Sequence, residues 1–199
     1  MNKDILITLT GKSGSGKSTI EKLLVNNKGY RRAVSHTSRP MRINEQAGRD
    51  YYYTSKEIMM SMFDQGKLAE FIEYNGNLYG VSVDELINSQ IIVIEPTGLK
   101  QVKEKMKDKK KVVSFFLNIS EETMFDRMKK RGDQESNILG RIEHDRHHFN
   151  VDMTDFDYII DVDEFTPSQI VSIINDILTS NYGQMSIFDI TEGDVNKNE

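Results

Sequence analysis

Residues 5–18 read ILITLTGKSGSGKS, and this stretch combines the two local patterns from which the fold class is predicted. Its first part, Ile5–Leu9, is a mainly apolar run of the kind found in strands that are buried on both faces. Its second part, Gly11–Ser18, matches the pattern G-x-x-x-x-G-K-[ST] at every fixed position. A helix is predicted to follow over about Thr19–Asn27. A glycine-rich loop between a buried strand and a helix is typical of proteins that bind nucleotide phosphates.

The loop motif predicts a role for each of its residues. The glycines let backbone N–H groups close around phosphate oxygens, and the start of the helix adds partial positive charge. Lys17 is expected to reach the β- and γ-phosphates, and the Ser18 hydroxyl is expected to complete the shell of a Mg²⁺ ion. A glycine-rich turn without a ligand is the alternative, which the agreement of motif and context disfavours. The predicted nucleotide-binding residues are Gly11, Lys12, Ser13, Gly14, Ser15, Gly16, Lys17, Ser18 and Thr19.

Further apolar runs alternate with helical segments along the chain. Residues 91–94, 112–117 and 158–160 are predicted to be buried strands. Three helix starts carry a capping box, and Pro167 suits the first position of its helix. Alternating strands and helices predict an α/β fold of three layers with a mostly parallel sheet. The capping boxes are Thr54 with Glu57, Ser82 with Glu85, and Thr166 with Gln169.

Two segments depart from this rhythm. Residues 37–80 contain a short helix and a hairpin signal, Asn75-Gly76, so we expect a small mixed α+β insertion there. The stretch from Arg131 to about Gly140 is polar, and we expect an irregular, mobile lid. After Ser180 the composition becomes polar and acidic, as in a partly disordered tail.

Composition excludes several classes of protein. The 199 residues are 37% hydrophobic and 29% charged, with a net charge of −5, so no direct binding of nucleic acid is expected. The absence of cysteine excludes disulfides and cysteine-bound metals, and fits a reducing cytoplasm. No signal peptide or membrane span is expected from the apolar runs, so a cytoplasmic protein is predicted.

A second motif follows the loop. Residues 36–42 read HTSRPMR, and Tyr51 comes nine residues after Arg42. Two arginines three residues apart, together with a tyrosine, have the chemistry to clamp a compact dianion.

This run resembles the monophosphate-binding arm of the guanylate kinase family, T-T/S-R-x-x-R-x-x-E-x-x-G-x-D-Y. The likeness continues through residues 71–74 and 77–80, so it implies a P-loop kinase core with a nucleotide-monophosphate-binding insertion. It also implies that Arg39, Arg42 and Tyr51 hold the acceptor 5′-phosphate, with Ser35 near it and Tyr79 assisting. Glu70 falls where the family accepts hydrogen bonds from guanine N1–H and N2–H₂, a choice that leaves adenine unpaired.

Three positions depart from the family pattern. Val81 stands where a serine usually contacts guanine, and Val93 occupies a position that is often acidic. Glu95 replaces an aspartate, so it must do that residue's work from a longer side chain. These departures put base selectivity in question more than the type of reaction.

The lid segment supplies arginines. Residues 128–133 resemble the family's lid entry, and by this resemblance Arg131 and Arg141 neutralise the transferring phosphoryl group while the lid excludes water. For Arg127 a solvated helix face is an equally good interpretation. His144, His147 and His148 are interpreted as surface residues rather than as a metal site, because only the first and last share a helix face.

The resemblance implies transfer of a phosphoryl group from ATP, with Mg²⁺, to GMP or dGMP. A related kinase with a broader deoxynucleotide or phosphosugar acceptor, and a non-catalytic interaction module, remain as alternatives. We expect one domain over 1–181, with its core in 1–36 and 81–181, an insertion at about 37–80 and a lid at about 131–141. Both a monomer and a homodimer are open.

The tail, residues 182–199, carries one more signal. Gln184–Phe188 reads QMSIF and resembles the peptide Q-L-S/D-L-F by which bacterial proteins dock on the DNA sliding clamp. The alternative is that Ile187 and Phe188 pack on the protein's own core.

Overall fold

The computed structural model describes residues 4–74, 76–149 and 152–179, and these residues form two compact units. The first combines the N-terminal residues up to Thr8 with Tyr30–Val113, and the second combines Leu9–Gly29 with the chain from Ser114 onward. Strands β1 and β7 each run from one unit into the other.

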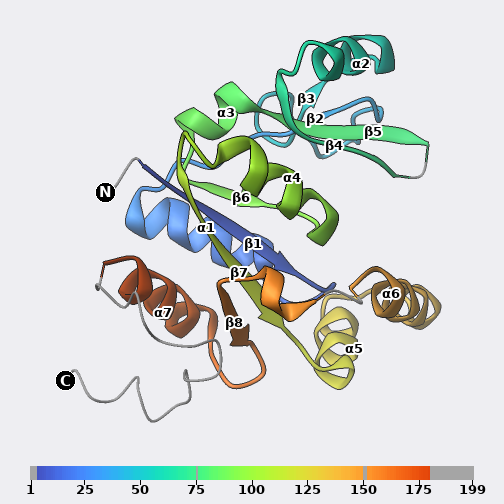
Figure 1. Cartoon of the computed structure of the whole chain (residues 1–199). Helices are drawn as coiled ribbons and strands as arrows, with labels where there is room; N and C mark the ends of the chain where they lie inside the picture. Colours follow the sequence, from blue (N-terminus) through green and yellow to red (C-terminus); the bar gives the residue numbers. More distant parts are fainter. Residues whose placement is uncertain (1–3, 75, 150–151, 180–199) are drawn as a thin grey trace. The chain divides into compact units, whose positions relative to one another are not determined.

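One sheet has the strand order β6-β1-β7-β8 (Figure 1). β7 and β8 pair in parallel, with Phe115 opposite Tyr158. The strand interiors are apolar and buried, as expected for a sheet with helices on its faces. These strands confirm the predicted α/β class and the four predicted buried strands. Their bounds are β1 Ile5–Gly11, β6 Ile91–Val93, β7 Lys111–Asn118 and β8 Tyr158–Asp161.

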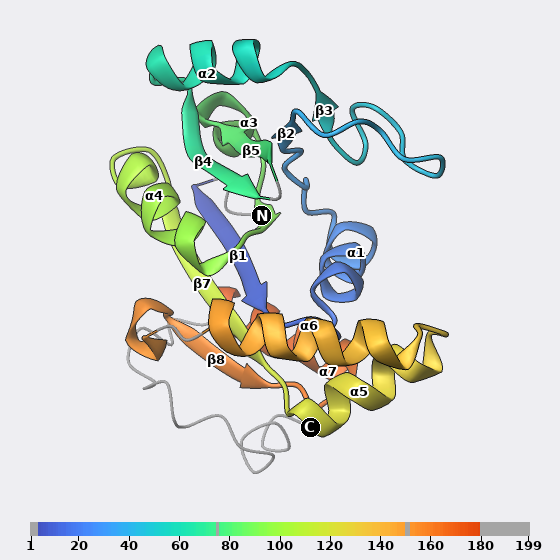
Figure 2. The same ribbon diagram turned by 90° about the vertical axis from the view of Figure 1, so that its right-hand side faces the viewer.

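The first unit holds a second, mixed sheet with the order β3-β2-β5-β4. β4 and β5 form the predicted antiparallel hairpin, with Tyr74 opposite Asn77 and with Gly76 at a φ of 70°. Helix α2 packs on this hairpin and α4 packs along β4 (Figures 1 and 2). The elements are β2 His36–Thr37, β3 Tyr52–Tyr53, α2 Lys56–Asp64, β4 Leu68–Tyr74, β5 Asn77–Ser82, α3 Val83–Asn88 and α4 Pro96–Met106.

The described residues of the second unit form four helices and a short 3₁₀ helix. α1 packs against α7, and α5 packs against α6 (Figure 1). Phe116 and Phe156, both buried, contact each other with ring centroids 5.0 Å apart. The elements are α1 Lys17–Lys28, α5 Glu121–Lys130, α6 Glu135–His148, η1 Met153–Asp155 and α7 Pro167–Thr179.

One predicted capping box is confirmed in full, at Thr166, and a second in part, at Ser82, because Glu85 Oε1 accepts the Val34 N–H instead of the Ser82 N–H. Ser82 accepts the Glu85 N–H, and Thr166 and Gln169 exchange hydrogen bonds at the start of α7. The third was wrong, because Ser55 rather than Thr54 caps α2. The Thr54 N–H bonds to the Thr37 carbonyl, so Thr54 still belongs to the sheet edge.

The expectation of an irregular stretch from Arg131 to Gly140 was also wrong in part, because α6 begins at Glu135. Ile138 and Ile142, four residues apart, are buried and give the helix an apolar face. That face stabilises the first turns of a helix that contain Ser136, Asn137 and Gly140, which are weak helix formers. Only residues 131–134 remain outside helices.

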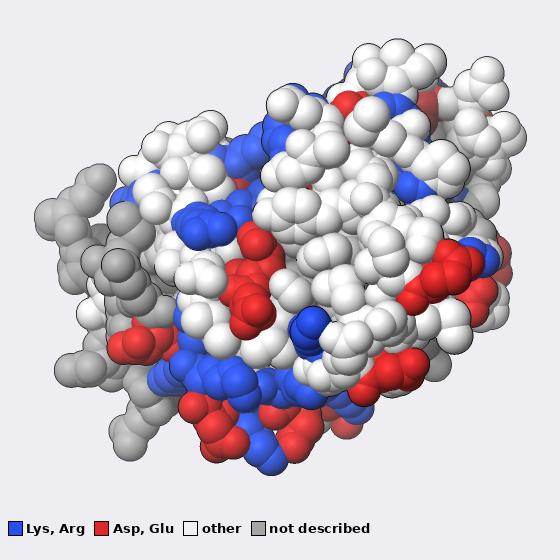
Figure 3. Space-filling model, turned by 90° about the horizontal axis from the view of Figure 1, so that it is seen from above, with Lys and Arg blue, Asp and Glu red and all other residues white. Residues whose placement is uncertain are grey.

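On the face drawn in Figure 3, basic side chains lie next to acidic ones. Ion pairs of the described residues include Arg49 with Asp50 and Arg146 with Glu121. None of the described helices combines the length and hydropathy needed to cross a bilayer. The tail motif Gln184–Phe188 lies outside the described residues.

Candidate active site

The loop between β1 and α1 has a backbone that only glycine accommodates at several points. Gly14 and Gly16 have φ values of 76° and 90°, in the left-handed region. At Gly11 a Cβ would lie 2.6 Å from the Leu117 carbonyl oxygen. α1 begins at Lys17, directly after Gly16, so the positive end of the helix dipole lies at the loop. The loop is therefore built to receive an anion.

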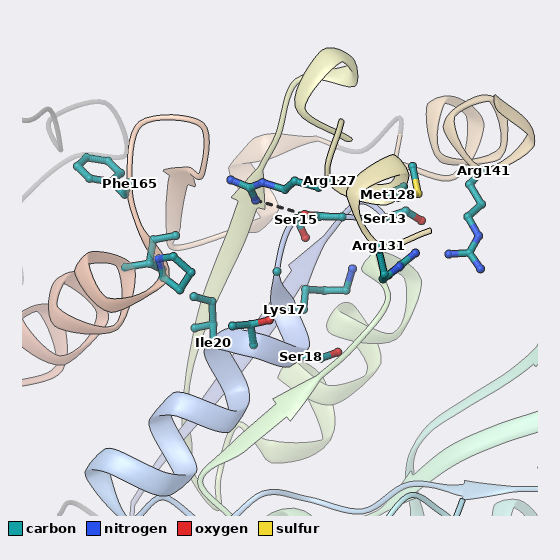
Figure 4. A pocket seen from close by; sticks show the side chains of 15 residues that line it. Ser13, Ser15, Lys17, Ser18, Ile20, Arg127, Met128, Arg131, Arg141 and Phe165 are labelled. Carbon is teal, nitrogen blue, oxygen red and sulfur yellow. Dashed lines mark hydrogen bonds between the residues drawn. The ribbon is translucent and has the colours of Figure 1, made fainter. Parts of the chain in front are cut away.

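A cavity of about 530 Å³ lies at this loop (Figure 4). Its volume is in the range of small-molecule binding sites. Four basic side chains line it and suit a polyphosphate, whereas Phe165, Pro167 and Ile170 provide apolar surface that suits a base. The lining consists of residues 13–20 with Arg127, Met128, Arg131, Arg141, Phe165, Pro167 and Ile170.

Lys17 lies at the centre of the predicted chemistry. Its ammonium group donates to the carbonyl oxygens of Gly11 and Lys12, the second at 3.0 Å. The loop backbone thus holds the ammonium group beside the cavity that Lys17 lines. A compact cation in this place attracts the outer phosphates of a bound triphosphate.

Arg131 and Arg141 both line the cavity, as Figure 4 shows, although they come from different elements. Arg131 caps the end of α5 and Arg141 lies on α6. Asp133, between them in sequence, binds Arg131 and lies 3.7 Å from an Arg141 nitrogen. The hydrogen bond from Arg131 is the main reason that the pKa of Asp133 is lowered. Asp133, which sequence reasoning missed, thus links the two predicted lid arginines.

Arg127 does not lie on a solvated helix face, which was one of the two interpretations of this residue. Its guanidinium donates to the carbonyl oxygens of Gly14, at 3.3 Å, and Val162, at 2.7 Å. It therefore supports the phosphate-binding loop and also contributes to the cavity wall.

The arginine-tyrosine arm lies in the first unit and is organised by Glu45. This carboxylate accepts hydrogen bonds from Arg39 at 2.7 Å, from the Arg42 backbone N–H at 2.8 Å, and from Tyr53 at 2.9 Å. Its pKa is lowered to about 2, chiefly by the hydrogen bond from Arg39. The Arg39 side chain is 13% exposed, and its ion pair with Glu45 holds the guanidinium in one orientation.

Three predicted acceptor residues come together around Arg39. Its guanidinium carbon lies 5.6 Å from the centre of the Tyr51 ring, and the Tyr51 and Tyr79 rings meet edge to face at 6.0 Å. The hydrogen bond to Glu45 is the main cause of the raised pKa of Arg39, and a hydrogen bond with Tyr79 raises it to a smaller extent. Two other predicted acceptor residues have different surroundings. The Arg42 side chain is exposed. The Ser35 carbonyl accepts a hydrogen bond from the Tyr52 N–H. Arg39, Tyr51 and Tyr79 thus form a cationic, hydroxyl-rich cluster suited to a phosphate.

Glu70 is the most unusual carboxyl group of the first unit. It is 6% exposed in β4, and its pKa is raised to about 7 by burial and, to a smaller extent, by the negative charge of Glu95. It packs directly against Gly98 in α4, where a Cβ would lie 2.1 Å from Glu70 Oε1. Sequence reasoning missed the role of Gly98, which is to leave room for this carboxylate. Val81, the departure from the family serine, is buried opposite Glu70 on β5.

The residues present fit a magnesium nucleotide. Ser18 is exposed in the first turn of α1 and lines the cavity. Its hydroxyl is an oxygen donor of the kind Mg²⁺ prefers, and this ion usually takes its other ligands from phosphates and water. Among the described residues no group of three or more His, Asp or Glu side chains has the arrangement of a metal site, and His147 is exposed beside Glu143.

The α/β fold and the glycine-rich loop, with a basic cavity above the start of a helix, define a P-loop nucleotide-binding protein. The family model described as Guanylate kinase matches residues 3–181. The chain is 33% identical to a guanylate kinase from Prochlorococcus marinus, with 85% of this chain and 96% of that protein covered. It is 32% identical to one from Vibrio cholerae, with 83% of each chain covered.

A solved structure supports the same relationship. The crystal structure of guanylate kinase from Anaplasma phagocytophilum is similar, with a TM-score of 0.60 and 26% identity over 87% of this chain and 84% of that chain. The chain belongs to the guanylate kinase family.

Proposed function

We propose that the protein transfers the γ-phosphoryl group of ATP to GMP or dGMP, giving ADP and the nucleoside diphosphate. The observation that carries this proposal is Glu70, a buried carboxylate on the unit that also holds the Arg39, Tyr51 and Tyr79 cluster. An acceptor-only group selects a base edge that presents two donors, and guanine is the purine that does so. Membership of the guanylate kinase family supports this assignment.

The chemistry assigned to this chain is mainly placement and neutralisation of charge. An oxygen of the acceptor phosphate attacks the γ-phosphorus as the bond to the leaving oxygen of ADP breaks. Lys17 binds the outer phosphates, and Arg131 and Arg141 neutralise the transferring group. Arg39, Arg42, Tyr51 and Tyr79 hold the acceptor phosphate, with Ser35 nearby. The Ser18 hydroxyl would hold a Mg²⁺ ion, which would offset the negative charge of the phosphates.

Base recognition is assigned to Glu70 and Glu95. Glu95 lies at the start of α4, and its negative charge helps to raise the Glu70 pKa. Two neighbouring carboxylates that repel one another are relieved when a ligand brings donors to them. Guanine N1–H and N2–H₂ supply such donors, and so the pair favours guanine despite Val81.

A panel of monophosphates tests the assignment. ADP release, coupled to NADH oxidation, is measured with GMP, dGMP, AMP, CMP, dTMP and ribose 5-phosphate. GMP or dGMP should give the highest kcat/KM. Faster turnover of another acceptor would refute the base assignment, whereas no acceptor-dependent turnover would favour a non-catalytic interaction module.

Some finer assignments are also proposals. We divide the chain into a core, a monophosphate-binding insertion at about 37–80 and a lid at about 131–141. The Asp133 bridge between Arg131 and Arg141 supports a lid in which both arginines act together. The cytoplasmic location expected from the cysteine-free sequence stays a prediction, as does the choice between monomer and homodimer.

Docking on a DNA sliding clamp through Gln184–Phe188 is a separate proposal, supported by the sequence motif alone. A variant truncated after Asn181 should keep its kcat while losing micromolar binding to a bacterial clamp. Changing Ile187 and Phe188 to alanine should reproduce this loss, whereas changing Glu192 should not. A lower melting temperature of the truncated variant, without any clamp binding by the full chain, would refute the idea.

A further inference from the structure

Helix α6 carries a buried carboxylate at a position where its pattern predicts an apolar residue. Ile138, Ile142 and Phe149 are buried at 8% exposure or less, and they define the packed face of the helix. Asp145 lies on the same face and is 4% exposed. Burial of a carboxylate is costly unless hydrogen bonds compensate it. A residue that breaks the local pattern at a cost in stability is a candidate for function.

The partners of Asp145 point to the phosphate-binding loop. Its Oδ2 accepts the backbone N–H of Ser13 at 2.6 Å, across 132 residues of sequence. Its Oδ1 lies 3.4 Å from Nδ1 of His144. Ser13 lines the cavity, while Asp145 is absent from the described residues that line it. The carboxylate thus holds the loop through a charge-assisted hydrogen bond without forming part of the cavity wall.

The same helix presents Arg141 to the cavity (Figure 4). Arg141 precedes Asp145 by four residues, so the two lie on neighbouring positions of one helix face. Arg146, the next residue, donates two hydrogen bonds of 2.6 Å to Glu121 of α5. The segment that follows Arg141 is therefore attached both to the loop and to α5.

We propose that Asp145 is a positioning residue, which fixes Arg141 relative to the phosphate-binding loop by accepting the Ser13 N–H. The proposal rests on the proposed phosphoryl transfer, in which Arg141 meets the transferring group. A long arginine side chain contributes to a reaction only if its backbone is held in register with the phosphates, because misplacement by about 1 Å can cost 10²-fold in rate. Asp145 supplies this register from a site that does not touch the nucleotide.

A double-mutant cycle tests the coupling. Asp145→Ala, Arg141→Ala and the double variant are compared by the Kd of a non-hydrolysable ATP analogue and by kcat with ATP and GMP. Asp145→Ala should weaken analogue binding and lower kcat, each by ~10-fold, but cost less than about threefold in the Arg141→Ala background. Asp145→Asn keeps an acceptor oxygen and should have an intermediate effect. Glu143→Gln changes an exposed carboxylate on the same helix and should leave both values unchanged.

Two outcomes of this cycle would overturn the proposal. Losses that multiply in the double variant would mean that Asp145 acts independently of Arg141. Tighter analogue binding by Asp145→Ala would mean that the carboxylate competes with phosphate for the Ser13 N–H. If the wild type failed to phosphorylate GMP, the proposed function would fall, while the cycle measured by Kd would still decide the coupling.

If the alanine variant does not fold, the asparagine variant carries the test. A neutral acceptor is weaker, so the Ser13 amide proton should move upfield in its NMR spectrum while that of Gly132 stays in place. Its analogue affinity should fall in the presence of Arg141 and not in its absence. An unshifted Ser13 amide, or an equal fall in both backgrounds, would contradict the proposal.

Discussion

Replacing Glu70 by glutamine removes a carboxyl group with a raised pKa. Burial is the main cause and the negative charge of Glu95 the second, and together they raise the pKa from 4.5 to about 7. The folded protein therefore binds this proton more tightly than the unfolded chain does. Between these two values the free energy of unfolding should fall as the pH rises, because the native state holds more protons. The pKa shift of about 2.5 means that ionised Glu70 lowers the free energy of unfolding by roughly 3 kcal/mol above pH 7.

Urea unfolding of the wild type and Glu70→Gln from pH 4.5 to 8.5, followed by circular dichroism, measures this penalty. The two proteins should have similar stability near pH 4.5, where Glu70 is protonated. At pH 8 the variant should be the more stable by up to about 3 kcal/mol. Burial lowers the pKa of His36 in both proteins, so the contribution of His36 to the pH dependence cancels in the difference between their free energies of unfolding. A difference that does not change with pH would refute the assigned pKa and the buried setting that causes it.

The same substitution should damage recognition of GMP while it stabilises the fold. Loss of one charged acceptor should lower kcat/KM for GMP by roughly 10- to 100-fold, from a contact of about 1.5–3 kcal/mol. In the wild type, KM for GMP should rise as the pH falls below about 7, since protonated Glu70 offers an O–H against the donors of guanine. The variant lacks this group, so its profile should keep only the titration of the GMP phosphate near pH 6. An unchanged preference for guanine would show that Glu70 does not read the base.

Four further substitutions test other parts of the site. Lys17→Ala should lower kcat by a hundredfold or more, because it removes a cation from the cavity at the phosphate-binding loop, and near-normal turnover in a folded variant would contradict the mechanism. Arg39→Ala and Arg42→Ala should each raise KM for the acceptor and leave the ATP Kd unchanged; a collapse of ATP affinity alone would mean that the arm is misassigned. In Gly98→Ala the added Cβ would lie 2.1 Å from Glu70 Oε1. KM for GMP should therefore rise, and the free energy of unfolding should fall by about 1–3 kcal/mol. An unaltered KM would mean that Gly98 does not affect base binding.

The sequence predicted those parts of the molecule that local patterns determine. The loop at Gly11–Ser18, the hairpin of β4 and β5, and the caps at Ser82 and Thr166 each depend on residues close in sequence. The choice of Ser55 over Thr54 as a cap had no local signal, because both carry a hydroxyl. It depends on the bond from Thr54 to Thr37, which belongs to the pairing of strands.

Gly98 and Asp145, two site residues that the sequence did not predict, act through distant partners. Asp133 was also missed, although it pairs with Arg131 and Arg141 close to it in the chain. Asp145 meets Ser13 across 132 residues, and Glu70 meets Gly98 only because α4 packs along β4. A signal for Asp145 was present in the sequence, since it falls in phase with Ile138 and Ile142. That phase is visible only when residues 138–145 belong to one helix, whereas an irregular segment was predicted up to about Gly140.

In the proposed reaction the γ-phosphoryl group of ATP passes directly to a guanine nucleotide. The wild-type protein is incubated with γ-³²P-labelled ATP, Mg²⁺ and GMP, and the products are separated by thin-layer chromatography. Label should appear in GDP, in an amount equal to the ADP formed, and no labelled ADP should form in an incubation that replaces GMP with AMP. Label recovered only as inorganic phosphate, or in ADP from the AMP incubation at a greater rate, would contradict it.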